Sequence, residues 1–484
     1  MSDTGGRSAS EEKARGRPRL EGSRVAVIGI GASGEAAARL ASTRGAAVYA
    51  SDVSAGDAQI AAAERLRSEG IDAEAGRHDM ERILGCELAV VSPGIPPSAQ
   101  VRREMREADL RTVTEAELAY WYLESRLVGI TGTNGKTTTT ALCGHLLREA
   151  GVDATTGGNI GRPLSEIALR EEQPDWVVVE LSSFQLADIE QLRTDVGIFL
   201  NLAPDHLDRY RDVEQYYSDK KRIFENATGD SRWVLNADDP DVLDLARNVR
   251  GEVHHVSVEE AVERGAYLGG DGSLRLRLPE REERWVQVDD LQLIGLHNVQ
   301  NALSAALAAA LVGCGREELV RGLKSFEPLP HRLQLVGEYG GVRWVNDSKA
   351  TNVSATSVAL RSFDEPVVLL LGGRHKGQDY GDLVEDFDRV RGVIAFGEAA
   401  PQIVGELEDG PAAIQVASGL ENVVDRAAGM AESGDVVLFS PACSSYDMFP
   451  SYEVRGERFM ELVRGRVDGP SAGGGASGGG EAGG

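Results

Sequence analysis

The sequence contains few cysteines and no long apolar run. Its 484 residues include four cysteines, Cys86, Cys143, Cys314 and Cys443, which lie far apart and form no C-x-x-C pair. This spacing argues against a zinc site and is typical of a protein from a reducing compartment. No apolar segment reaches membrane length and no signal peptide opens the chain, so we expect a cytoplasmic protein that does not insert into a membrane.

Positive charge is also scarce. The chain has 51 Lys and Arg residues against 77 Asp and Glu residues, which gives a formal net charge of −26. A field of this sign repels nucleic acid and anionic lipid, so we expect neither as a partner. Anionic substrates would need local positive sites made by backbone N–H groups, by Lys or Arg side chains, or by a metal ion.

Apolar strand-like segments alternate with helix-like segments along most of the chain, which predicts an α/β protein with parallel sheets. At roughly 150 residues per domain, the length predicts about three domains. We place them at 21–124, 125–328 and 329–468, with less regular short strands over 251–293. Residues 1–20 and the Gly-rich tail 469–484 are expected to be disordered.

The stretch 129–140, GITGTNGKTTTT, is similar to a phosphate-binding loop. Gly135, Lys136 and Thr137 meet the end of the pattern G-x-x-x-x-G-K-[ST], but its first glycine is moved to Gly132. Backbone N–H groups at a helix N-terminus bind phosphate by hydrogen bonds and by the helix dipole. We interpret the stretch as a variant phosphate loop, with Lys136 on the β- and γ-phosphates and Thr137 on Mg²⁺. The alternative is an ordinary tight turn.

A second glycine set, GIGASG, holds Gly29, Gly31 and Gly34 after an apolar strand, and Asp52 ends the next strand. This pattern matches the dinucleotide fingerprint, which by itself is weak. It predicts that the first domain binds a diphosphate-containing nucleotide, with Asp52 on a ribose or base. The turn SPGI (92–95) should lie at the same sheet edge, although a plain Pro-Gly turn explains it equally well.

Three further residues suit a metal site near the phosphate loop. Glu180 ends the apolar strand WVVVE, His206 follows the strand VGIFLNL, and Lys220 lies in DKKRIFENA. Mg²⁺ needs hard oxygen ligands, and Glu180 stands where such a carboxylate is expected. A cap or surface role for the carboxylate, and a structural role for the histidine, remain the alternatives.

Polar motifs continue through the last third of the chain. GLHNVQNAL places Asn298 and Asn301 on one helix face, although an N-cap and a surface amide are the simple alternative. Three strands then end in polar loops at the edge where open α/β sheets bind ligands. These loops, together with LPHR, carry Arg332, Asp347, Lys349, Thr351, Arg374, Lys376, Ser444 and Ser445. We interpret the cations among them as a carboxylate-binding cluster in an acidic protein.

At this point the sequence resembles the Mur ligase family. The motifs GITGTNGKTTTT, GGNIG, ELSSFQL, DHLDRY, GLHNVQNAL, LPHR, NDSKATN, GGRHKG and SPACSSYDMF occur in the family's order, and the match runs from about 24 to 464. The last three motifs look like those of the D-glutamate-adding members, and the D-N-P motif of the diaminopimelate- or lysine-adding members is not found. The resemblance implies a Rossmann-like N-terminal domain, a central P-loop ATPase-like domain with a parallel sheet, and a C-terminal Rossmann-like domain.

The resemblance also implies roles for single residues. ATP would be bound by Gly132, Thr133, Asn134, Gly135, Lys136, Thr137, Thr138, Asn298, Asn301, Arg332 and Asp347. The UDP substrate would be bound by Gly31, Ala32, Ser33, Gly34, Asp52, Gly94 and Asn159. D-glutamate would be bound by Lys349, Thr351, Lys376, Ser445 and Tyr452, the last being Phe in many members. Two Mg²⁺ ions would use Thr137, Glu180, His206 and Lys220, with Lys220 carbamylated; Lys136, His206, Lys220 and Lys349 would be catalytic.

The implied activity is ATP-dependent addition of D-glutamate to UDP-N-acetylmuramoyl-L-alanine, through an acyl phosphate, in peptidoglycan synthesis. We expect a monomer. The alternatives are a Mur ligase that adds another amino acid, a folylpolyglutamate synthetase-like enzyme, an NAD-dependent oxidoreductase that uses GIGASG, and a nucleotide switch without transferase chemistry. The first domain argues against the folate relative, and the oxidoreductase would leave the phosphate loop at 129–140, Glu180 and Lys220 unexplained. A switch would leave the cationic third domain without a role.

Overall fold

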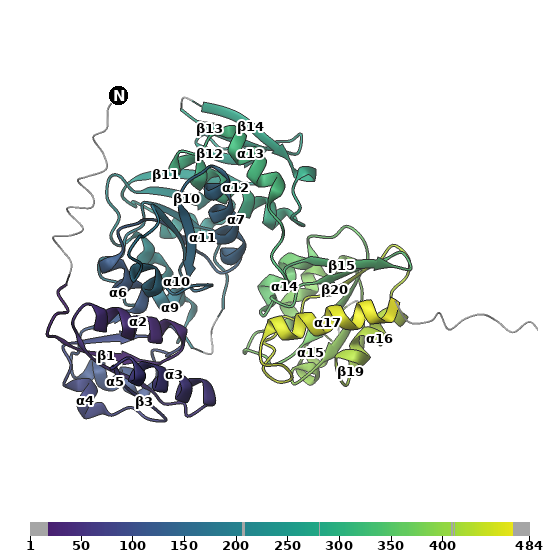
Figure 1. Cartoon of the computed structure of the whole chain (residues 1–484). Helices are drawn as coiled ribbons and strands as arrows, with labels where there is room; N and C mark the ends of the chain where they lie inside the picture. Colours follow the sequence, from purple (N-terminus) through teal and green to yellow (C-terminus); the bar gives the residue numbers. More distant parts are fainter. Residues whose placement is uncertain (1–17, 206–208, 280, 408–409, 411, 468–484) are drawn as a thin grey trace, which may run out of the picture. The chain divides into compact units, whose positions relative to one another are not determined.

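The computed structural model describes residues 18–205, 209–279, 281–407, 410 and 412–467. The chain divides into two compact units, Met1–Glu327 and Pro328–Gly484. The first unit holds two sheets and the second unit holds one (Figure 1). Among the described residues, no helix combines the length and the apolar character needed to cross a membrane.

The first sheet is fully parallel, with strand order β3-β2-β1-β4-β5. Its strands are β1 (Arg24–Ile28), β2 (Ala47–Asp52), β3 (Asp72–Ala75), β4 (Leu88–Val91) and β5 (Thr112–Thr114). Its helices are α2 (Ala32–Thr43), α3 (Asp57–Ser68), α4 (Met80–Leu84), α5 (Gln100–Glu107) and α6 (Glu115–Tyr122). From β1 the chain continues to β2 and β3 on one side of β1 in the sheet, and then crosses to β4 and β5 on the other side. The carboxyl ends of β1 and β4 therefore form a topological switch point, where such sheets bind ligands.

The second sheet has the order β14-β13-β12-β11-β10-β9-β6-β8-β7. Its strands are β6 (Arg126–Thr131), β7 (Ala154–Gly158), β8 (Trp176–Glu180), β9 (Val196–Phe199), β10 (Arg232–Asn236), β11 (Glu252–Ser257), β12 (Gly265–Leu268), β13 (Ser273–Leu278) and β14 (Arg281–Gln287). Its helices are α7 (Lys136–Glu149), α8 (Leu164–Ala168), α9 (Ser183–Leu186), α10 (Val213–Lys221), η1 (Arg222–Phe224), α11 (Pro240–Leu245), η2 (Val288–Asp290), α12 (Leu296–Val312) and α13 (Arg316–Ser325). Strands such as β8 are buried along their whole length, because helices cover both faces of the parallel part.

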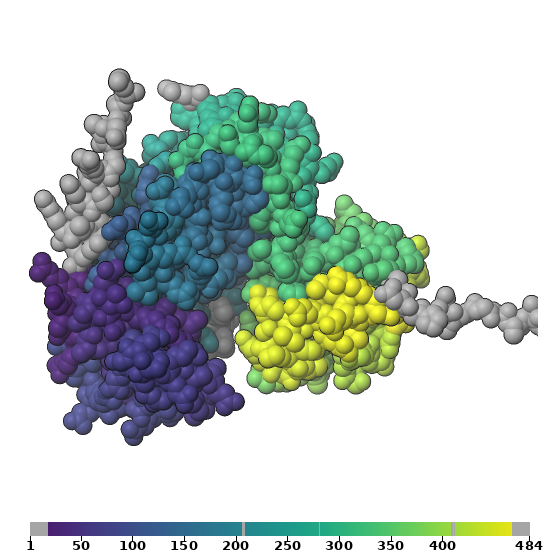
Figure 2. Space-filling model, in the orientation of Figure 1, coloured from purple at the N-terminus to yellow at the C-terminus, as the bar shows by residue number. Residues whose placement is uncertain are grey.

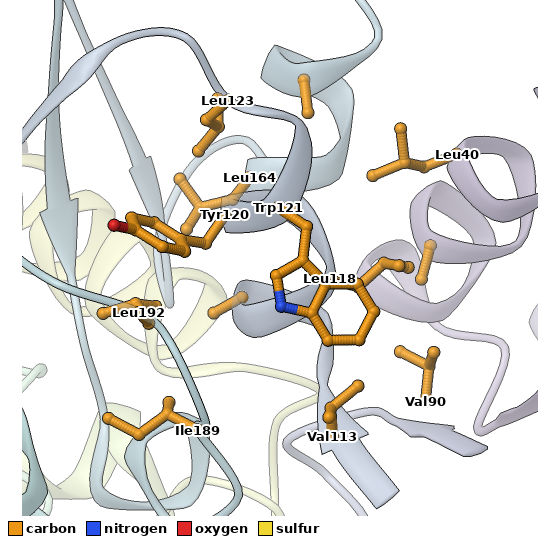
Figure 3. Close-up of a cluster of buried hydrophobic side chains, with 14 of the residues drawn as sticks. Leu40, Val90, Val113, Leu118, Tyr120, Trp121, Leu123, Leu164, Ile189 and Leu192 are labelled. Carbon is orange, nitrogen blue, oxygen red and sulfur yellow. The ribbon is translucent and has the colours of Figure 1, made fainter. Parts of the chain in front are cut away.

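The first two sheets belong to one unit because they share a hydrophobic core around α6 (Figure 3). In this core the side chains of α6 lie among Leu40, Val90, Val113, Leu164, Ile189 and Leu192. Glu117 of α6 accepts hydrogen bonds from the backbone N–H groups of Gln191 and Leu192, each at 2.8 Å, and from the Trp121 indole at 2.6 Å. These bonds satisfy a carboxylate that is fully buried at the junction. Within the first unit, the space-filling view shows the purple surface of the first sheet and its helices adjoining the blue surface of the second (Figure 2).

The third sheet, in the second unit, has the order β15-β16-β20-β17-β18-β19. Its strands are β15 (Gln334–Tyr339), β16 (Val342–Asn346), β17 (Val367–Gly372), β18 (Val390–Phe396), β19 (Ala413–Ala417) and β20 (Val436–Phe439). Its helices are α14 (Val353–Leu360), η3 (Tyr380–Arg389), α15 (Ala400–Leu407), α16 (Leu420–Met430) and α17 (Tyr452–Val467). A separate core of apolar side chains from the strands, α16 and α17 lies on one face.

The α/β class with three sheets rich in parallel strands is confirmed. The departure from a purely parallel arrangement lies at two places. β13 and β14 pair antiparallel at the end of the second sheet, and β15 pairs antiparallel with β16. Gly340 and Gly341 connect β15 to β16 with φ of 63° and 76°. Two successive left-handed residues make the tight turn that a hairpin needs, and glycine adopts them without strain.

Candidate active site

The variant phosphate loop connects β6 to α7, and α7 begins at Lys136 as expected. Gly135 precedes the helix with φ of 81°, and a Cβ at this position would lie 2.4 Å from Oδ1 of Asn301. Gly132, with φ of 147°, passes close to Leu200 and Asn201. The two glycines therefore allow the loop to pack tightly against α12 and against the segment after β9. Thr137 and Thr138 follow in the first turn of α7.

Two side chains hold the loop in shape. The Asn134 N–H donates to Oδ1 of Asn201 at 2.8 Å, and Nδ2 of Asn201 donates back to the Asn134 carbonyl at 3.1 Å. The Thr133 hydroxyl donates to the Ala203 carbonyl at 3.1 Å and lies 3.2 Å from the Tyr216 hydroxyl. Asn201 was not predicted as a site residue; its position directly after a buried strand was the available signal.

Lys136 and Lys220 converge on one backbone oxygen. Nζ of Lys220 donates to the Gly132 carbonyl at 2.7 Å, and Nζ of Lys136 donates to the same oxygen at 2.9 Å. Lys136 also donates to the Thr133 carbonyl at 2.7 Å. Two residues that are 84 positions apart by number (220 − 136) therefore meet at the phosphate loop.

Lys220 is 1% exposed. Burial in the first place, and the charge of Lys136 in the second, hold the pKa of Lys220 well below its ordinary value; Asp205 and Glu180 act in the opposite direction. The Tyr216 ring lies 4.6 Å from Nζ. Burial and a neighbouring cation both favour the neutral amine of a lysine, which is its nucleophilic form.

Glu180 and Asn159 also come together at the carboxyl ends of β7 and β8. Nδ2 of Asn159 donates to Oε1 of Glu180 at 2.8 Å. Oε2 of Glu180 is buried and has no hydrogen-bond partner among the described residues. A buried carboxylate oxygen without a partner is a ligand that a hard cation such as Mg²⁺ accepts. His206 lies outside the described residues, and within them no three His, Cys, Asp or Glu side chains form a metal-binding group.

Asn298 and Asn301 lie on one buried face at the start of α12. Nδ2 of Asn301 donates to Oδ1 of Asn298 at 3.1 Å, and Nδ2 of Asn298 donates to the Ile294 carbonyl at 2.8 Å. Oδ1 of Asn301 accepts from the Thr139 hydroxyl at 3.2 Å. The two amides therefore brace the end of the phosphate loop, and the prediction that they share a face is confirmed.

The other nucleotide-like loop follows β1. Gly34 is essential for its shape, because a Cβ there would lie 1.7 Å from the Gly29 carbonyl oxygen. Gly31 and Ala32 are exposed, Ser33 is half-buried at the start of α2, and Gly94 is exposed after β4 on the other side of the switch point.

Asp52 ends β2 and is turned to the same loop. Its Oδ2 accepts from the Ile30 N–H at 3.0 Å, and its Oδ1 accepts from the Ser54 N–H at 2.9 Å. Both carboxylate oxygens thus have backbone partners, and Asp52 orders the loop after β1.

In the second unit, the three predicted polar loops do follow β16, β17 and β20, whose parallel pairing places their carboxyl ends at one edge. Nζ of Lys376 donates to the Thr351 hydroxyl at 3.3 Å. Nζ of Lys349 lies 3.9 Å from the centroid of the Tyr452 ring. Ser445 is buried in the loop after β20. Four of the residues predicted to bind D-glutamate thus form two contacting pairs.

Asp347 and Arg332 lie at the same edge. Asp347 accepts from the Leu333 N–H at 3.2 Å and from the Ser440 hydroxyl at 2.8 Å. Burial raises the pKa of Asp347 to about 7, although these donors and the charges of Arg332 and Arg455 lower it. Arg332 is half-buried between His331 and Leu333, which have φ of 63° and 42°. Ala442, in the loop after β20, has φ of 57°.

Left-handed backbone is uncommon at residues other than glycine, is better tolerated by asparagine, aspartate and histidine than by other types, and clusters at functional sites. His331, Leu333 and Ala442 are three of the five described non-glycine residues with positive φ; the other two are Asp109 and Asn248. This uncommon backbone is thus concentrated beside the polar loops of the second unit.

Arg455 was not predicted, yet it connects the loops after β16 and β20 and contacts the last residue of β17. The side chain is fully buried on α17 and donates to the Ser348 hydroxyl at 3.0 Å, to the Ser348 carbonyl at 2.8 Å and to the Cys443 carbonyl at 3.0 Å. A longer contact of 3.5 Å reaches the Gly372 carbonyl. Burial lowers its pKa to about 10, so the guanidinium stays charged at neutral pH. In sequence it reads as an ordinary cation on a helix surface.

Arg374 and Ser444 lie beside these pairs. The backbones of the two residues form an isolated bridge, and the Arg374 guanidinium donates to Glu398 at 3.1 Å. Arg374 therefore already has a carboxylate partner in the protein, which leaves Lys349 and Lys376 as the cations of the predicted cluster that contact other predicted site residues.

Comparison with known proteins agrees with this geometry. The Mur ligase middle domain matches residues 130–309, and the Mur ligase glutamate ligase domain matches residues 331–443. A UDP-N-acetylmuramoylalanine–D-glutamate ligase of Geotalea uraniireducens is 41% identical over 92% of this chain and 98% of its own. The enzyme of the same name from Anaeromyxobacter dehalogenans is 43% identical over 92% of this chain and 98% of its own.

Solved structures share the fold at lower identity. UDP-N-acetylmuramate–alanine ligase from Thermotoga maritima has a TM-score of 0.57 at 18% identity, over 92% of this chain and all of its own. MurF ligase from Thermotoga maritima, solved in complex with ADP, has a TM-score of 0.57 at 17% identity, over 94% of this chain and 96% of its own. The domain matches and the near full-length relatives together show that the chain belongs to the Mur ligase family, among the UDP-N-acetylmuramoylalanine–D-glutamate ligases.

Proposed function

We propose that the protein is an ATP-dependent ligase that joins D-glutamate to UDP-N-acetylmuramoyl-L-alanine in the synthesis of peptidoglycan precursors. The observation that carries this proposal is the meeting of Lys136 and Lys220 at the Gly132 carbonyl, in a chain whose near full-length relatives bear this enzyme's name. We also propose that it acts as a cytoplasmic monomer.

In this proposal the first sheet holds the UDP part of the substrate. The loop after β1, from Gly31 to Gly34, lies at a helix N-terminus and suits a diphosphate. Gly94 stands across the switch point, and Asn159 lies toward the reacting end of the substrate. Asp52 contributes by ordering the loop, because both of its oxygens are already used by backbone N–H groups.

The phosphate loop and the start of α7 hold ATP. Lys136 leaves the carbonyls of Gly132 and Thr133 and turns to the phosphates, whose charge offers it a stronger partner. Asn298 and Asn301 keep the loop and α12 together. Arg332 and Asp347 are proposed contacts to the nucleotide from the second unit.

Thr137, Glu180, His206 and Lys220 would hold Mg²⁺, for which we propose two sites, and the unpartnered oxygen of Glu180 fits such a role. When bound, Mg²⁺ would neutralise the negative charge that develops on the phosphates. A protonated Lys220 would repel the cation. Its lowered pKa favours the neutral amine, the form that can add to carbon dioxide, lose a proton and become an anionic carbamate.

The chemistry then has two steps. An oxygen of the substrate's alanine carboxylate attacks the γ-phosphorus, and the bond to ADP breaks, which leaves an acyl phosphate. The nitrogen of D-glutamate attacks the acyl carbon, phosphate leaves, and the nitrogen gives up a proton. Lys136 and Lys349 stabilise the negative charge of both transition states. Thr351, Lys376, Ser445 and Tyr452 hold D-glutamate through its carboxylates and its carbon chain.

The test is phosphate release from ATP in the presence of UDP-N-acetylmuramoyl-L-alanine, with D-glutamate, L-lysine or diaminopimelate offered in turn. We expect release with D-glutamate alone. Release with another amino acid would keep the family and the mechanism but would refute the assignment of the second unit's loops. No release with any of the three would refute the proposal.

A further inference from the structure

A cavity of about 600 Å³ lies at the opposite end of the first sheet from the nucleotide loops. Its lining comes from the amino ends of β1, β2 and β3 and from α4 with the turn that follows. The loops at the switch point follow the carboxyl ends of β1 and β4, so none of the proposed site residues lines this cavity. Its volume is typical of a site for a small molecule.

The charged groups that line the cavity are balanced. Arg24 and Arg82 supply two guanidinium groups, and Asp72 and Glu81 supply two carboxylates. Arg82 pairs with Asp72, and Arg24 pairs with Glu87 at 3.5 Å. All four of these partners are substantially exposed, at 41–63% of their side-chain surface. Exposed ion pairs are worth about 0–1 kcal/mol each, so a ligand displaces them at small cost.

The remaining wall is apolar and aromatic. Val48 and Ile71 are buried beneath it, and Ala46 and Ala47 lie beside them. The Arg82 guanidinium lies 3.8 Å from the centroid of the Tyr49 ring, which holds that cation at the cavity. The stacking fixes one charged group in position and leaves a side group of the ligand an apolar surface to cover.

We propose that this cavity binds a small zwitterion with an apolar side group, either a free amino acid or a short peptide. Its carboxylate would contact Arg82 and Arg24, its ammonium would contact Asp72 and Glu81, and its side group would cover Ala46 and Ala47 beside the buried Val48 and Ile71. A simple anion would meet two carboxylates at close range and the net charge of −26 beyond them. A zwitterion can pair its carboxylate with the guanidinium groups and its ammonium with the carboxylates.

Cys86 offers a direct measurement, because it also lines the cavity and is half-buried, whereas Cys143, Cys314 and Cys443 are buried. The experiment follows alkylation of Cys86 by iodoacetamide in the full-length protein at about pH 7, where the α-ammonium groups of the probes stay charged, over long reaction times because burial raises the pKa of this thiol. The probes are L-leucine and L-leucyl-L-leucine, with N-acetyl-L-leucine and L-leucinamide as singly charged controls. For a millimolar dissociation constant, about 10 mM of a zwitterion slows the reaction about tenfold.

The two zwitterions distinguish an amino acid from a peptide as the better ligand. Protection by either one, with weak protection by the singly charged controls, supports the proposal. Equal protection by all four compounds, protection by none, or protection by UDP instead would overturn it. The readout requires no ligase activity, so its failure is distinct from failure of the proposed function.

Variants locate the effect. In Arg82→Gln and in Asp72→Asn, the alkylation rates with and without the zwitterion should become equal. In Arg77→Gln, the ratio of the two rates should stay as it is in the unchanged protein. Arg77 is exposed, pairs with Glu74 and does not line the cavity. Because the ratio is taken within each variant, a change in the basal reactivity of Cys86 does not affect it. Protection that survives both cavity variants would overturn the assignment.

Discussion

Burial sets the chemistry of two single residues, Lys220 and Asp347. Lys220 is buried beside Lys136, and both effects disfavour its charged form. Asp347 in the second unit is buried as well, and the same effect disfavours the carboxylate. In both cases burial shifts the pKa toward the neutral form, which for the lysine is the nucleophilic amine and for the aspartate is the protonated carboxyl.

We expect Lys220→Ala to lower ligase turnover about 10²–10³-fold, which is typical for loss of a preorganised charged group. Added formate or acetate should restore part of the activity, since a short carboxylate supplies the oxygens that the carbamate would offer. Lys221→Ala is the matched control, because Lys221 is the exposed neighbour on α10. Full activity of Lys220→Ala without any additive would contradict the carbamate.

Asp347 should make the protein more stable in mild acid. Its pKa is about 7 in the folded state against an ordinary 3.8, so the folded protein binds more protons over that window and loses stability as pH rises through it. In Asp347→Asn, urea midpoints at about pH 5 and about pH 7.5 should differ by less than in the unchanged protein. Asp364→Asn, at a side chain that is 96% exposed, should leave the difference as it was. Equal behaviour of the two variants would refute the assignment.

At the scale of elements, the phosphate loop is defined by how closely its backbone approaches α12. Gly135 combines a left-handed backbone with a position 2.4 Å from Asn301 for any added Cβ. Gly151, at the far end of α7, has a similar φ of 75° but open space around it. Substitutions at these two glycines therefore distinguish the effect of backbone strain from the effect of steric contact.

We expect Gly151→Ala to lower stability by about 1 kcal/mol through backbone strain alone. Gly135→Ala should lower it by more and should also weaken ATP binding, because Asn301 must move and the loop with it. Thermal unfolding and ATP titration calorimetry check the two effects. If both variants bound ATP equally well, the contact between the loop and α12 would have no part in the site.

Helix α17 fixes the second unit's loops through Arg455. Hydrogen bonds to a charged group are worth about 1.5–3 kcal/mol each, so Arg455→Met should lower the free energy of unfolding by about 3 kcal/mol or more. It should also raise KM for D-glutamate more than it raises KM for ATP, because the loops carry Lys349, Lys376 and Ser445.

The matched control is Arg458→Met, one turn along α17. Arg458 is exposed and pairs with Glu421 and Glu461. Its loss should change stability by less than about 1 kcal/mol and leave both KM values unchanged. Equal effects of the two substitutions would mean that the buried guanidinium does not position the loops.

Much of this arrangement could be predicted from the sequence, because strands such as 176–180 are apolar up to the last residue and their ends carry the polar motifs. Glu180, Lys136 and Asn301 stand at such ends or at helix starts, where local pattern is informative. Arg455 could not be found in this way, and Asn201 had only its position after a buried strand as a signal. A buried Arg on a helix and a loop amide that braces another loop depend on contacts distant in the chain, which local periodicity does not show.

At the scale of the whole molecule, the excess of acidic residues opposes the approach of ATP and of a UDP-linked substrate. The net charge of −26 repels both at long range, while the cations that bind them act only nearby. The two compact units have separate cores, but they share this field.

We therefore expect kcat/KM for ATP to rise as ionic strength increases from about 0.01 to about 0.15 M, because the Debye length falls from about 30 to about 8 Å. For an enzyme whose net positive charge attracts ATP, kcat/KM would fall as ionic strength increases. Initial rates in NaCl at fixed free Mg²⁺ check the sign. For an uncharged substrate analogue, kcat/KM should not depend on ionic strength. A kcat/KM for ATP that falls as ionic strength increases would contradict the expectation.

The attachment of three segments to one guanidinium also limits how this enzyme can change over evolutionary time. A substitution in any one of these segments alters the common anchor, because Arg455 donates to Ser348 and Cys443 and contacts the Gly372 carbonyl at the end of β17. Mutations in the segments after β16, β17 and β20 should therefore show epistasis, with tolerated pairs that are each harmful alone. New amino-acid preferences would then arise through coordinated changes in the three segments, while the anchor itself stays the same.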